Sequence, residues 1–565
     1  MFLIFSARTL LHSLWLGAEG VLMEDSLETS GADIEPRDVL LRPTNQFTIQ
    51  FNNLYCTLPD GTRILNGASG TLSPSSFTAI MGASGAGKST LMNVIAGNVK
   101  KSDGEISVNG IECANLRCMK AEVSFVPQED IMHRELTVLQ NLTFSAAIQL
   151  PRETTQRQRE RCVYDTLIKL RLEHIRHNIV GDEVHRGISG GQRKRLNIGL
   201  DLVSCRSIVF LDEPTTGLDA VTATEIAQIL TTISKEKMLT ITAVIHNPGV
   251  RAFSLFSDLI LLQAGGRVAF AGGTEDCEGY FASLGFHRDC DVDGPFPDFV
   301  LLCLSGDKRP LGEPTWDSNE SFSIAWLQYK CSMKEGNTPV HHSTMLSRRK
   351  NHAPGFKFQF MFCLDRAIMQ AYPSFRHFLR LYVLAPYLMG IVLGRIIGNP
   401  LAQNVLGAHA TDICLQQHPD LIERCLTLQQ NGYMNALQPC GFNVLALYGS
   451  VASGTFGKEK VIYVRECSYG LNKLSYFCAK VIADVPRIYF SALGTSMGFT
   501  LRFVSAMSSR EIQGGFTILV TFAYIIGYAV SFLVPYERCS LICVLFGLCM
   551  GSTFGGVAMP MSTGV

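Results

Sequence analysis

The sequence predicts an α/β P-loop domain followed by an all-α polytopic transmembrane domain. A glycine-rich loop at 82–89 joins a β-prone apolar stretch to a helical segment. A second apolar stretch, 208–211, ends in two carboxylates. After residue 380 the apolar content rises, and five stretches are each long enough to cross a hydrocarbon core of about 30 Å. A chain of 565 residues has room for several domains.

The loop at 82–89 has the sequence of a phosphate-binding loop. A strand is expected over 77–81 and a helix from Lys88 onward, which is the context that such a loop requires. Glycines allow a tight turn whose backbone N–H groups face phosphate oxygens, and the helix N-terminus adds partial positive charge. We expect Lys88 to reach the β- and γ-phosphates of ATP and Ser89 to hold Mg²⁺. The expected nucleotide-binding residues here are Gly82, Ala83, Ser84, Gly85, Ala86, Gly87, Lys88, Ser89 and Thr90.

The stretch 208–211 (Ile-Val-Phe-Leu) is apolar on both faces, which is typical of a central strand in a parallel sheet. Its end would deliver Asp212 and Glu213 to the crevice in which ligands bind in open α/β sheets. We expect Asp212 to reach Mg²⁺ through water and Glu213 to polarise the attacking water. A strand that ends in one solvated acid is common. Two acids followed by Pro-Thr-Thr-Gly-Leu-Asp favour an α/β P-loop ATPase domain.

Further segments resemble the motifs of ABC ATPases. Ser189-Gly190-Gly191-Gln192 is similar to the signature motif of that family and would form a second anion site ahead of a helix. Gln128 matches the Q-loop, and Asp219 lies in a segment similar to the D-loop. His246, after an apolar run, matches the switch histidine.

The resemblance implies a dimer with two ATP molecules sandwiched between subunits. The signature motif of one chain then faces the γ-phosphate of the nucleotide bound by the other. The catalytic residues implied are Glu213, His246 and Gln128. The Mg²⁺ ligands implied are Ser89, Gln128 and Asp212, and Ser189, Gly190, Gly191, Gln192 and Asp219 join the ATP-binding residues.

Tyr55 is a candidate for stacking on adenine, because it lies upstream of the phosphate-binding loop. An aromatic residue in a β-prone segment is more often part of the core. Both interpretations stay open for this residue.

The charge composition argues against a nucleic-acid partner, because Lys+Arg and Asp+Glu each number 49. The 18 cysteines include no Cys-x-x-Cys pair. Those of the ATPase half are expected to be reduced thiols in the cytosol. The first 22 residues lack a basic leader and a clear cleavage site, so no signal peptide is expected. We expect a disordered extension over 1–44, or a natural start at Met23.

The remaining chain divides into three parts by composition. We expect the ATPase domain over 45–304, a polar linker with short helices over 305–360, and the transmembrane domain over 361–565. The expected spans are 381–398, 441–457, 483–503, 514–535 and 541–560. Each has too few polar residues at period 3.6 for the amphipathic helix of a soluble core.

Basic residues predict the orientation of the spans, since cytosolic loops are enriched in Lys and Arg. Three arginines precede the first span, one lies between the first and second spans, and five basic residues follow the second. These are Arg366, Arg376 and Arg380, then Arg424, then Lys458, Lys460, Arg465, Lys473 and Lys480. This alternation places the first half in the cytosol and predicts an integral, multi-pass membrane protein.

The order of the two domains resembles the G (white) subfamily of ABC half-transporters. Residues 189–195 are close to the subfamily's Ser-Gly-Gly-Glu-Arg-Lys-Arg, with Gln192 as a departure, and 245–248 resemble its Ile-His-Gln-Pro, with Asn247 as a departure. The segment 456–486 follows the subfamily pattern after its second span. The resemblance covers about 45–560. The subfamily has six spans, whereas this sequence stops at Val565, at the end of its fifth apolar stretch, so we expect a fragment, an incomplete gene model or a truncated protein.

The loop 399–440 is long for the subfamily and is expected outside the cytosol, where thiols oxidise. Cys414, Cys425 and Cys440 lie in it. One disulfide among them and three free thiols are both compatible with the sequence.

The expected function is that of an ATP-hydrolysing half-transporter. It would dimerise with itself or another half-transporter, contact membrane lipid, and move a lipid, sterol or other hydrophobic small molecule. One alternative is a regulatory, non-transporting ATPase subunit of a heteromeric ABC complex. A soluble ABC ATPase acting on DNA or ribosomes is disfavoured by the five apolar stretches and the zero net charge. The sequence leaves the particular membrane open.

Overall fold

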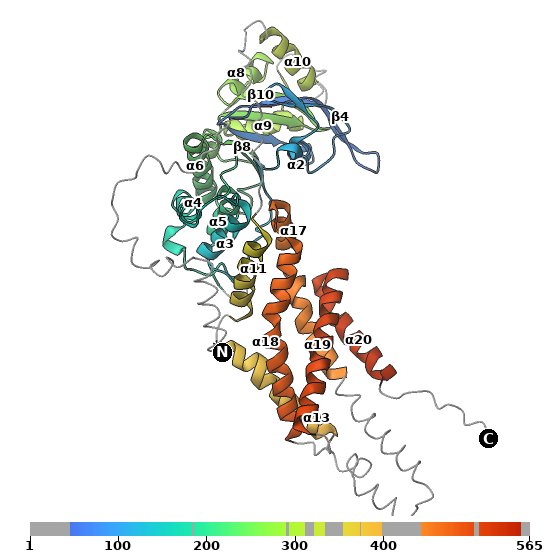
Figure 1. Ribbon diagram of the computed structural model, residues 1–565. Helices are drawn as coiled ribbons and strands as arrows, with labels where there is room; N and C mark the ends of the chain where they lie inside the picture. Colours follow the sequence, from blue (N-terminus) through green and yellow to red (C-terminus); the bar gives the residue numbers. More distant parts are fainter. Residues whose placement is uncertain are drawn as a thin grey trace, which may run out of the picture. The chain divides into compact units, whose positions relative to one another are not determined.

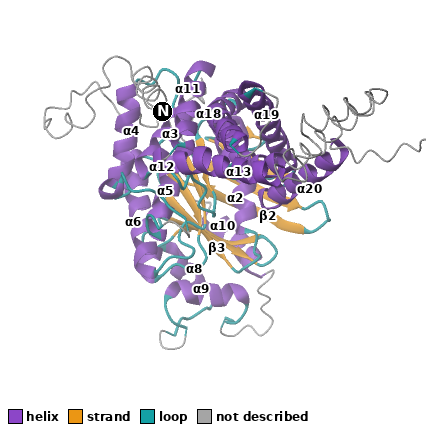
Figure 2. Ribbon diagram, turned by 90° about the horizontal axis from the view of Figure 1, so that it is seen from below, coloured by secondary structure: helices purple, strands orange, loops and turns teal. Residues whose placement is uncertain are grey.

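The computed structural model of the chain separates into two compact units, with the boundary between Pro354 and Gly355 (Figure 1). The described residues are 46–182, 186–289, 293–310, 321–333, 354–372, 375–397, 442–501 and 508–554. The expected extension over 1–44, the loop with the three cysteines and much of the expected linker lie outside them. Every described strand belongs to the first unit, and the second unit is helical (Figure 2). The predicted fold class, an α/β domain followed by a helical domain, is confirmed.

The first unit is built around a six-stranded sheet in the order β10-β9-β3-β8-β7-β6. All neighbouring pairs are parallel except β10 with β9. Ile208 to Leu211 on β7 are at most 1% exposed, because a parallel strand between two neighbours buries both faces. The strands are β3 (Phe77–Gly82), β6 (Val123–Val126), β7 (Ile208–Asp212), β8 (Thr240–Val244), β9 (Asp258–Gln263) and β10 (Arg267–Gly273).

A second, antiparallel sheet has the order β2-β1-β4-β5. On β1, buried residues such as Ile49 and Phe51 alternate with exposed ones, as expected for a sheet with one face on the core. Its strands are β1 (Ile49–Thr57), β2 (Arg63–Leu72), β4 (Asp103–Val108) and β5 (Ile111–Cys113).

Helices complete the first unit. Two of them, α3 and α4, begin with capping boxes in which a threonine and a glutamine satisfy each other's backbone N–H groups. The helices are α2 (Lys88–Ala96), η1 (Leu116–Met119), α3 (Val138–Gln149), α4 (Gln156–Lys169), η2 (Glu173–Ile175), α5 (Gly190–Leu202), α6 (Ala220–Lys237), α7 (Val250–Phe253), α8 (Asp276–Ser283) and α9 (Phe296–Ser305).

The expected linker contains a helix, α10 (Ser321–Met333), that packs into the core of the first unit. Phe322 is fully buried, and its ring stacks on Phe286 at 5.3 Å. The ring of Trp326 lies 5.1 Å from that of Phe270 on β10. Aromatic burial therefore attaches this part of the linker to the ATPase unit.

The second unit consists of helices of very different lengths. A helix over 442–457 precedes α17, and α19 begins with a capping box and ends ahead of Pro535, which cannot continue a helix. The named helices are α11 (Phe356–Ala371), α12 (Phe375–Phe378), the π-helix η3 (Leu379–Leu384), α13 (Ala385–Ile397), α17 (Lys460–Tyr469), α18 (Lys473–Thr500), α19 (Ser509–Leu533) and α20 (Tyr536–Phe554).

Two segments among the described residues are long and apolar enough to cross a membrane: Arg376–Arg395, with a mean hydropathy of 1.4, and Ser509–Leu533, with 2.0. They correspond to the first and fourth expected spans, although both begin five residues earlier than expected. The described part of the third expected span lies in α18 as far as Thr500. It carries Asp484 and Arg487, which form an ion pair of 2.8 Å. The multi-pass topology remains a prediction.

Small residues bring α18 close to the first candidate span. A Cβ atom added at Gly498 would lie 2.0 Å from the carbonyl oxygen of Tyr387, and one added at Gly390 would lie 2.1 Å from that of Thr495. Glycines permit this approach of two backbones, a common device between membrane helices. Phe378 meets Phe490 while Tyr387 meets Gly498, so the two helices run in the same direction.

Two of the basic residues that we used to predict orientation are buried in ion pairs. Arg366 on α11 is fully buried and donates to both carboxylate oxygens of Glu466 on α17, at 2.5 and 2.9 Å. Lys480 on α18 is 6% exposed and donates to Glu459 at 2.8 Å. These cations are part of the packing of the second unit rather than a charged loop surface.

Breaking the Arg366–Glu466 pair is expected to destabilise the second unit. Glu466→Gln removes the carboxylate and leaves a buried guanidinium without its counter-charge, at a cost of roughly 3–5 kcal/mol. The double variant Arg366→Met with Glu466→Met should recover most of that loss, because an apolar pair needs no charge compensation. Unfolding of the detergent-solubilised protein measures both, with the exposed Glu537→Gln on α20 as control. Equal stability of Glu466→Gln and the parent would contradict this account.

Candidate functional site

The site residues gather because four neighbouring strands of the main sheet end at the same edge. In the order β3-β8-β7-β6, all neighbouring pairs are parallel, so their carboxyl ends coincide. The phosphate-binding loop follows β3, His246 follows β8, and Gln128 follows β6. Asp212 ends β7, and Glu213 comes next. Ligands bind in this crevice in open α/β sheets.

The loop from Gly82 to Gly87 requires glycine at two positions. Gly82 has φ 149°, and a Cβ atom there would lie 2.1 Å from the carbonyl oxygen of Leu262. Gly87, the N-cap of α2, has φ 88°, in the left-handed region that glycine adopts at no steric cost. The loop therefore returns tightly onto the sheet and presents the N-terminus of α2, whose first residues are Lys88, Ser89 and Thr90.

Lys88 is folded back over the loop. It is 5% exposed, and its Nζ donates to the carbonyl oxygens of Gly82 at 3.0 Å and Ala83 at 2.9 Å. Burial lowers the pKa of Lys88, and the nearby Glu213 carboxylate opposes that shift. The ammonium group therefore lies against the backbone of the phosphate-binding loop.

Ser89 and Asp212 are in direct contact, with the Ser89 hydroxyl donating to Asp212 Oδ1 at 2.9 Å. Burial raises the pKa of the Asp212 carboxyl, and the hydrogen bond from Ser89 partly offsets this. A buried carboxylate gains from a nearby cation, and hydroxyl, carboxylate and amide oxygens are the ligands that Mg²⁺ prefers. Ser89 and Asp212, with the amide of Gln128, therefore fit a Mg²⁺ ion bound together with a nucleotide.

Glu213 is the centre of the site. Its Oε2 accepts from Gln128 Nε2 at 2.8 Å and from Thr216 Oγ1 at 2.9 Å, while its Oε1 lies 3.4 Å from His246 Nε2. Its backbone has φ 48°, an uncommon conformation for a residue other than glycine. We did not single out Thr216 from the sequence, although its hydroxyl three residues after an acid was a usable signal.

The signature segment forms the beginning of α5. Ser189 is the N-cap: its Oγ accepts from the backbone N–H of Gln192, whose side chain accepts in turn from the N–H of Ser189. Glutamine and glutamate both serve at this position of a capping box. The departure at Gln192 therefore keeps the geometry of the helix N-terminus and removes one negative charge.

The signature segment also contacts the first turn of α6. A Cβ atom at Gly191 would lie 2.6 Å from the methyl group of Thr222. Thr222 donates to the carboxylate of Asp219, the N-cap of α6, through its backbone N–H at 3.0 Å and its hydroxyl at 2.7 Å. These hydrogen bonds lower the pKa of the Asp219 carboxyl. Asp219 and the signature segment thus form a second cluster, joined through Thr222.

Two side chains of α5 hold the backbone around Gln128. Lys194, which is 6% exposed, donates to the carbonyl oxygen of Gln128 at 2.6 Å. Asn197, one turn later and fully buried, donates to the carbonyl oxygens of Pro127 at 3.3 Å and Glu129 at 3.2 Å. We call this arrangement the α5 clamp. It connects the helix of the signature segment to the residue that contacts Glu213, and the sequence analysis did not find it.

Tyr55 lies on β1 and is half-buried. It pairs with Asn66 on β2, and the guanidinium of Arg63 lies 5.8 Å from its ring centroid. Ile64 and Leu65, next to Asn66 on β2, adjoin Gly87. The ring is therefore not part of the fully buried core, and its stacking role remains a prediction.

Comparison with known proteins agrees with these features. The sequence profile of the ABC transporter family matches residues 65–216, which include the phosphate-binding loop, the signature segment and Glu213. The profile of the ABC-2 type transporter family matches residues 246–334, which run from His246 to the end of α10.

Similarity extends into the second unit. The chain is 31% identical to ABC transporter G family member 7 of Arabidopsis thaliana over 511 residues, 85% of this chain and 65% of the relative. The chain is thus similar to members of the ABC transporter G family over most of its length. Member 25 of that family from rice (Oryza sativa subsp. japonica) is 29% identical over 87% of this chain and 49% of its own length. The chain thus spans about half to two-thirds of the length of these relatives.

A third relative is similar over a shorter part of the chain. The broad substrate specificity ATP-binding cassette transporter ABCG2 of Sus scrofa is 36% identical over 288 residues, 50% of this chain and 42% of the relative.

We expect Lys88 and Glu213 to separate ATP binding from ATP hydrolysis. Lys88→Ala removes a charged donor and should weaken ATP binding about tenfold or more. Glu213→Gln keeps the shape of the side chain but not its basicity, so ATP should still bind while hydrolysis slows by about 10²–10⁴. Nucleotide binding and phosphate release on the purified protein measure the two effects. Normal hydrolysis by Glu213→Gln would exclude Glu213 as the base.

The α5 clamp is expected to affect turnover more than binding. Lys194→Met leaves the carbonyl oxygen of Gln128 without its donor, a loss of about 1–3 kcal/mol, so kcat should fall about tenfold. ATP affinity in a Glu213→Gln background should change little, because Lys194 contacts no phosphate-loop residue through a described hydrogen bond. Lys194→Arg should restore much of kcat, and the exposed Lys235→Met serves as control. A selective rise in KM with normal kcat would refute a positioning role.

Proposed function

We propose that this chain is an ATP-hydrolysing half-transporter that pairs with a second half-transporter and moves a lipid, sterol or other hydrophobic compound across a membrane. The observation that carries the proposal is the set of contacts around Glu213. Gln128, Thr216 and His246 meet its carboxylate at the edge of the sheet where Lys88 and Ser89 also lie. That arrangement suits phosphoryl transfer to water, in which the protein supplies position and charge.

Glu213 can act as the base through one of its two oxygens. Oε2 already accepts two hydrogen bonds, from Gln128 and Thr216. Oε1 faces His246 at 3.4 Å, a longer and weaker contact. In this proposal Oε1 takes the proton of the attacking water, and His246 stabilises the transferred phosphate. Ser89, Asp212 and Gln128 would hold Mg²⁺, which neutralises phosphate charge when bound.

Ser189 supports a composite site between two chains. Its hydroxyl accepts from the N–H of Gln192, so its own proton can still be donated to a phosphate oxygen. The N–H groups of Gly190 and Gly191 begin α5 beside it, which is a suitable anion site. In the proposed dimer, this end of α5 binds the γ-phosphate of the ATP that lies beside the partner's Lys88. The regulatory-subunit alternative gains no support from a site with these catalytic groups intact.

Reconstitution into lipid vesicles tests the proposal. ATPase activity should rise when the correct hydrophobic compound is added, and the compound should move across the bilayer only with ATP. Glu213→Gln should abolish both effects. Stimulation that requires a different G-family half-transporter would establish a heteromeric complex. ATP hydrolysis that no hydrophobic compound and no partner alters would contradict the transporter proposal.

A further inference from the structure

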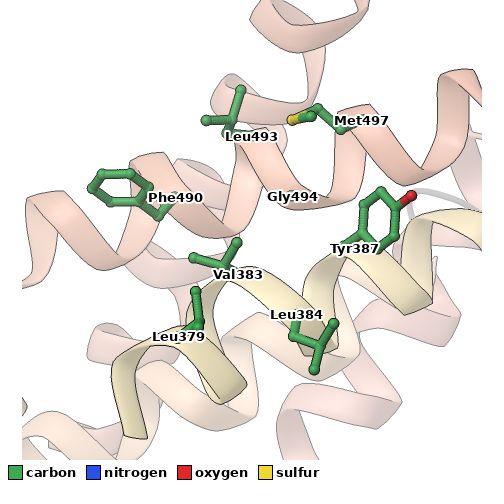
Figure 3. Close-up of a pocket in the computed structure, with 8 residues that line it drawn as sticks. All are labelled: Leu379, Val383, Leu384, Tyr387, Phe490, Leu493, Gly494 and Met497. Carbon is green, nitrogen blue, oxygen red and sulfur yellow. The ribbon is translucent and has the colours of Figure 1, made fainter. Parts of the chain in front are cut away.

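An apolar groove of about 250 Å³ lies between the first candidate span and α18 (Figure 3). Leu379, Val383 and Leu384 line one wall, and Phe490, Leu493 and Met497 line the other. Its volume is below the ~300–1,000 Å³ typical of sites for drug-sized ligands. A slender apolar chain fits this space better than a bulky ring system.

The groove exists because the helix geometry changes at this point. Leu379 to Leu384 form the π-helix η3, whose wider turn departs from the α-helices on either side. Gly494 brings α18 close to η3 itself, because a Cβ atom there would lie 2.8 Å from the carbonyl oxygen of Val383. Beyond η3, Gly498 continues this close backbone contact at Tyr387. The groove is the space left where the widened turn meets this close crossing. π-Turns are frequent at functional sites.

The groove is open to the surroundings of the helices. Leu379 is 44% exposed, Leu384 49% and Met497 55%, although all three are large apolar side chains. Both helices form the proposed membrane domain, where the surroundings are lipid. Burying such side chains in hydrocarbon is favourable, so an acyl chain is the natural occupant.

Two arginines lie near the groove in sequence, one just before its first lining residue and one directly after it. Arg376 precedes Leu379 by three residues and Arg380 precedes Leu384 by four, so each lies about one turn before a lining residue. Both side chains are exposed. They lie at the end of the span nearer to the ATPase unit in sequence, which the proposed topology places at the cytosolic membrane surface. Arginine binds phosphate through a planar fork of donors, and cytosolic leaflets carry anionic lipids.

We propose that this groove binds an anionic phospholipid, with one acyl chain between η3 and α18 and the phosphate on Arg376 and Arg380. The apolar space has the size of an acyl chain, and the two arginines at its cytosolic end would bind an anionic headgroup. Together they indicate an anionic phospholipid as the occupant. Arginine side chains near a membrane surface extend to the headgroup level, which keeps both charges hydrated while they bind phosphate. The inference rests on the membrane insertion assumed in the proposed function, but not on ATP hydrolysis or transport.

A tryptophan reporter tests the site directly. Leu493→Trp places an indole in the groove, and Ile518→Trp on α19, 73% exposed and outside the groove, is the matched reporter. Each protein is reconstituted in vesicles that contain a small fraction of lipid brominated in the acyl chains, either phosphatidylglycerol or phosphatidylcholine. Bromine quenches a nearby indole, so quenching reports which lipid is adjacent. The parent protein corrects for the three native tryptophans.

Quenching of the Leu493→Trp reporter is expected to show a preference of at least about fivefold for brominated phosphatidylglycerol over brominated phosphatidylcholine. The reporter at position 518 should show no such preference. Arg376→Gln with Arg380→Gln should remove the preference, whereas Arg395→Gln, at the other end of the same span, should keep it. Lys88→Ala should leave it unchanged, so loss of transport alone does not affect this test.

Three results would overturn the proposal. Equal quenching by the two lipids at position 493 would show a nonspecific lipid contact. A preference that survives loss of both arginines would place the phosphate elsewhere. Quenching by neither lipid, with normal quenching at position 518, would show that another helix or a hydrophobic substrate occupies the groove.

Discussion

The position of the Glu213 carboxylate is the constraint on which the proposed chemistry depends. Four neighbouring parallel strands end at one edge, and each delivers a group to it. Glu213 has φ 48°, a conformation that costs of order 1–3 kcal/mol and persists where neighbours determine it. Gln128 and Thr216 both donate to its Oε2, and this anchors the side chain. With this backbone conformation and the two hydrogen bonds to Oε2, the other carboxylate oxygen, Oε1, faces His246.

The α5 clamp connects the groups around Glu213 to the signature segment, which forms the other half of the proposed composite site. Lys194 and Asn197 hold three consecutive carbonyl groups, of residues 127–129, against the helix that begins at Ser189. The backbone around Gln128 is therefore tied to α5 by three hydrogen bonds. In the proposed dimer, α5 moves toward the nucleotide that the partner binds. Because α5 holds the backbone of Gln128, and Gln128 donates to Glu213, this movement would shift the position of Glu213 in the same chain. Hydrolysis at one site would then depend on closure at the other.

The sequence predicted the ATPase unit well because its motifs stand at strand ends and helix starts, where spacing alone determines position. It did not predict Lys194 and Asn197, because their partners lie about 70 residues earlier and only tertiary packing brings them together. The second unit was predicted less completely. Hydropathy located its apolar helices but did not show that Asp484 and Arg487 form a pair, that Arg366 is buried, or that α10 joins the first unit.

The composite site is the central claim, and nucleotide retention tests it most directly. Glu213→Gln protein is incubated with ATP and Mg²⁺ and then passed rapidly through a desalting column. The account predicts about one retained ATP per chain, since symmetry duplicates each site in a dimer. Ser189→Arg in the same background should bind ATP at equilibrium but lose it on the column, because the partner's signature no longer closes the site. Equal retention by both proteins would contradict the account.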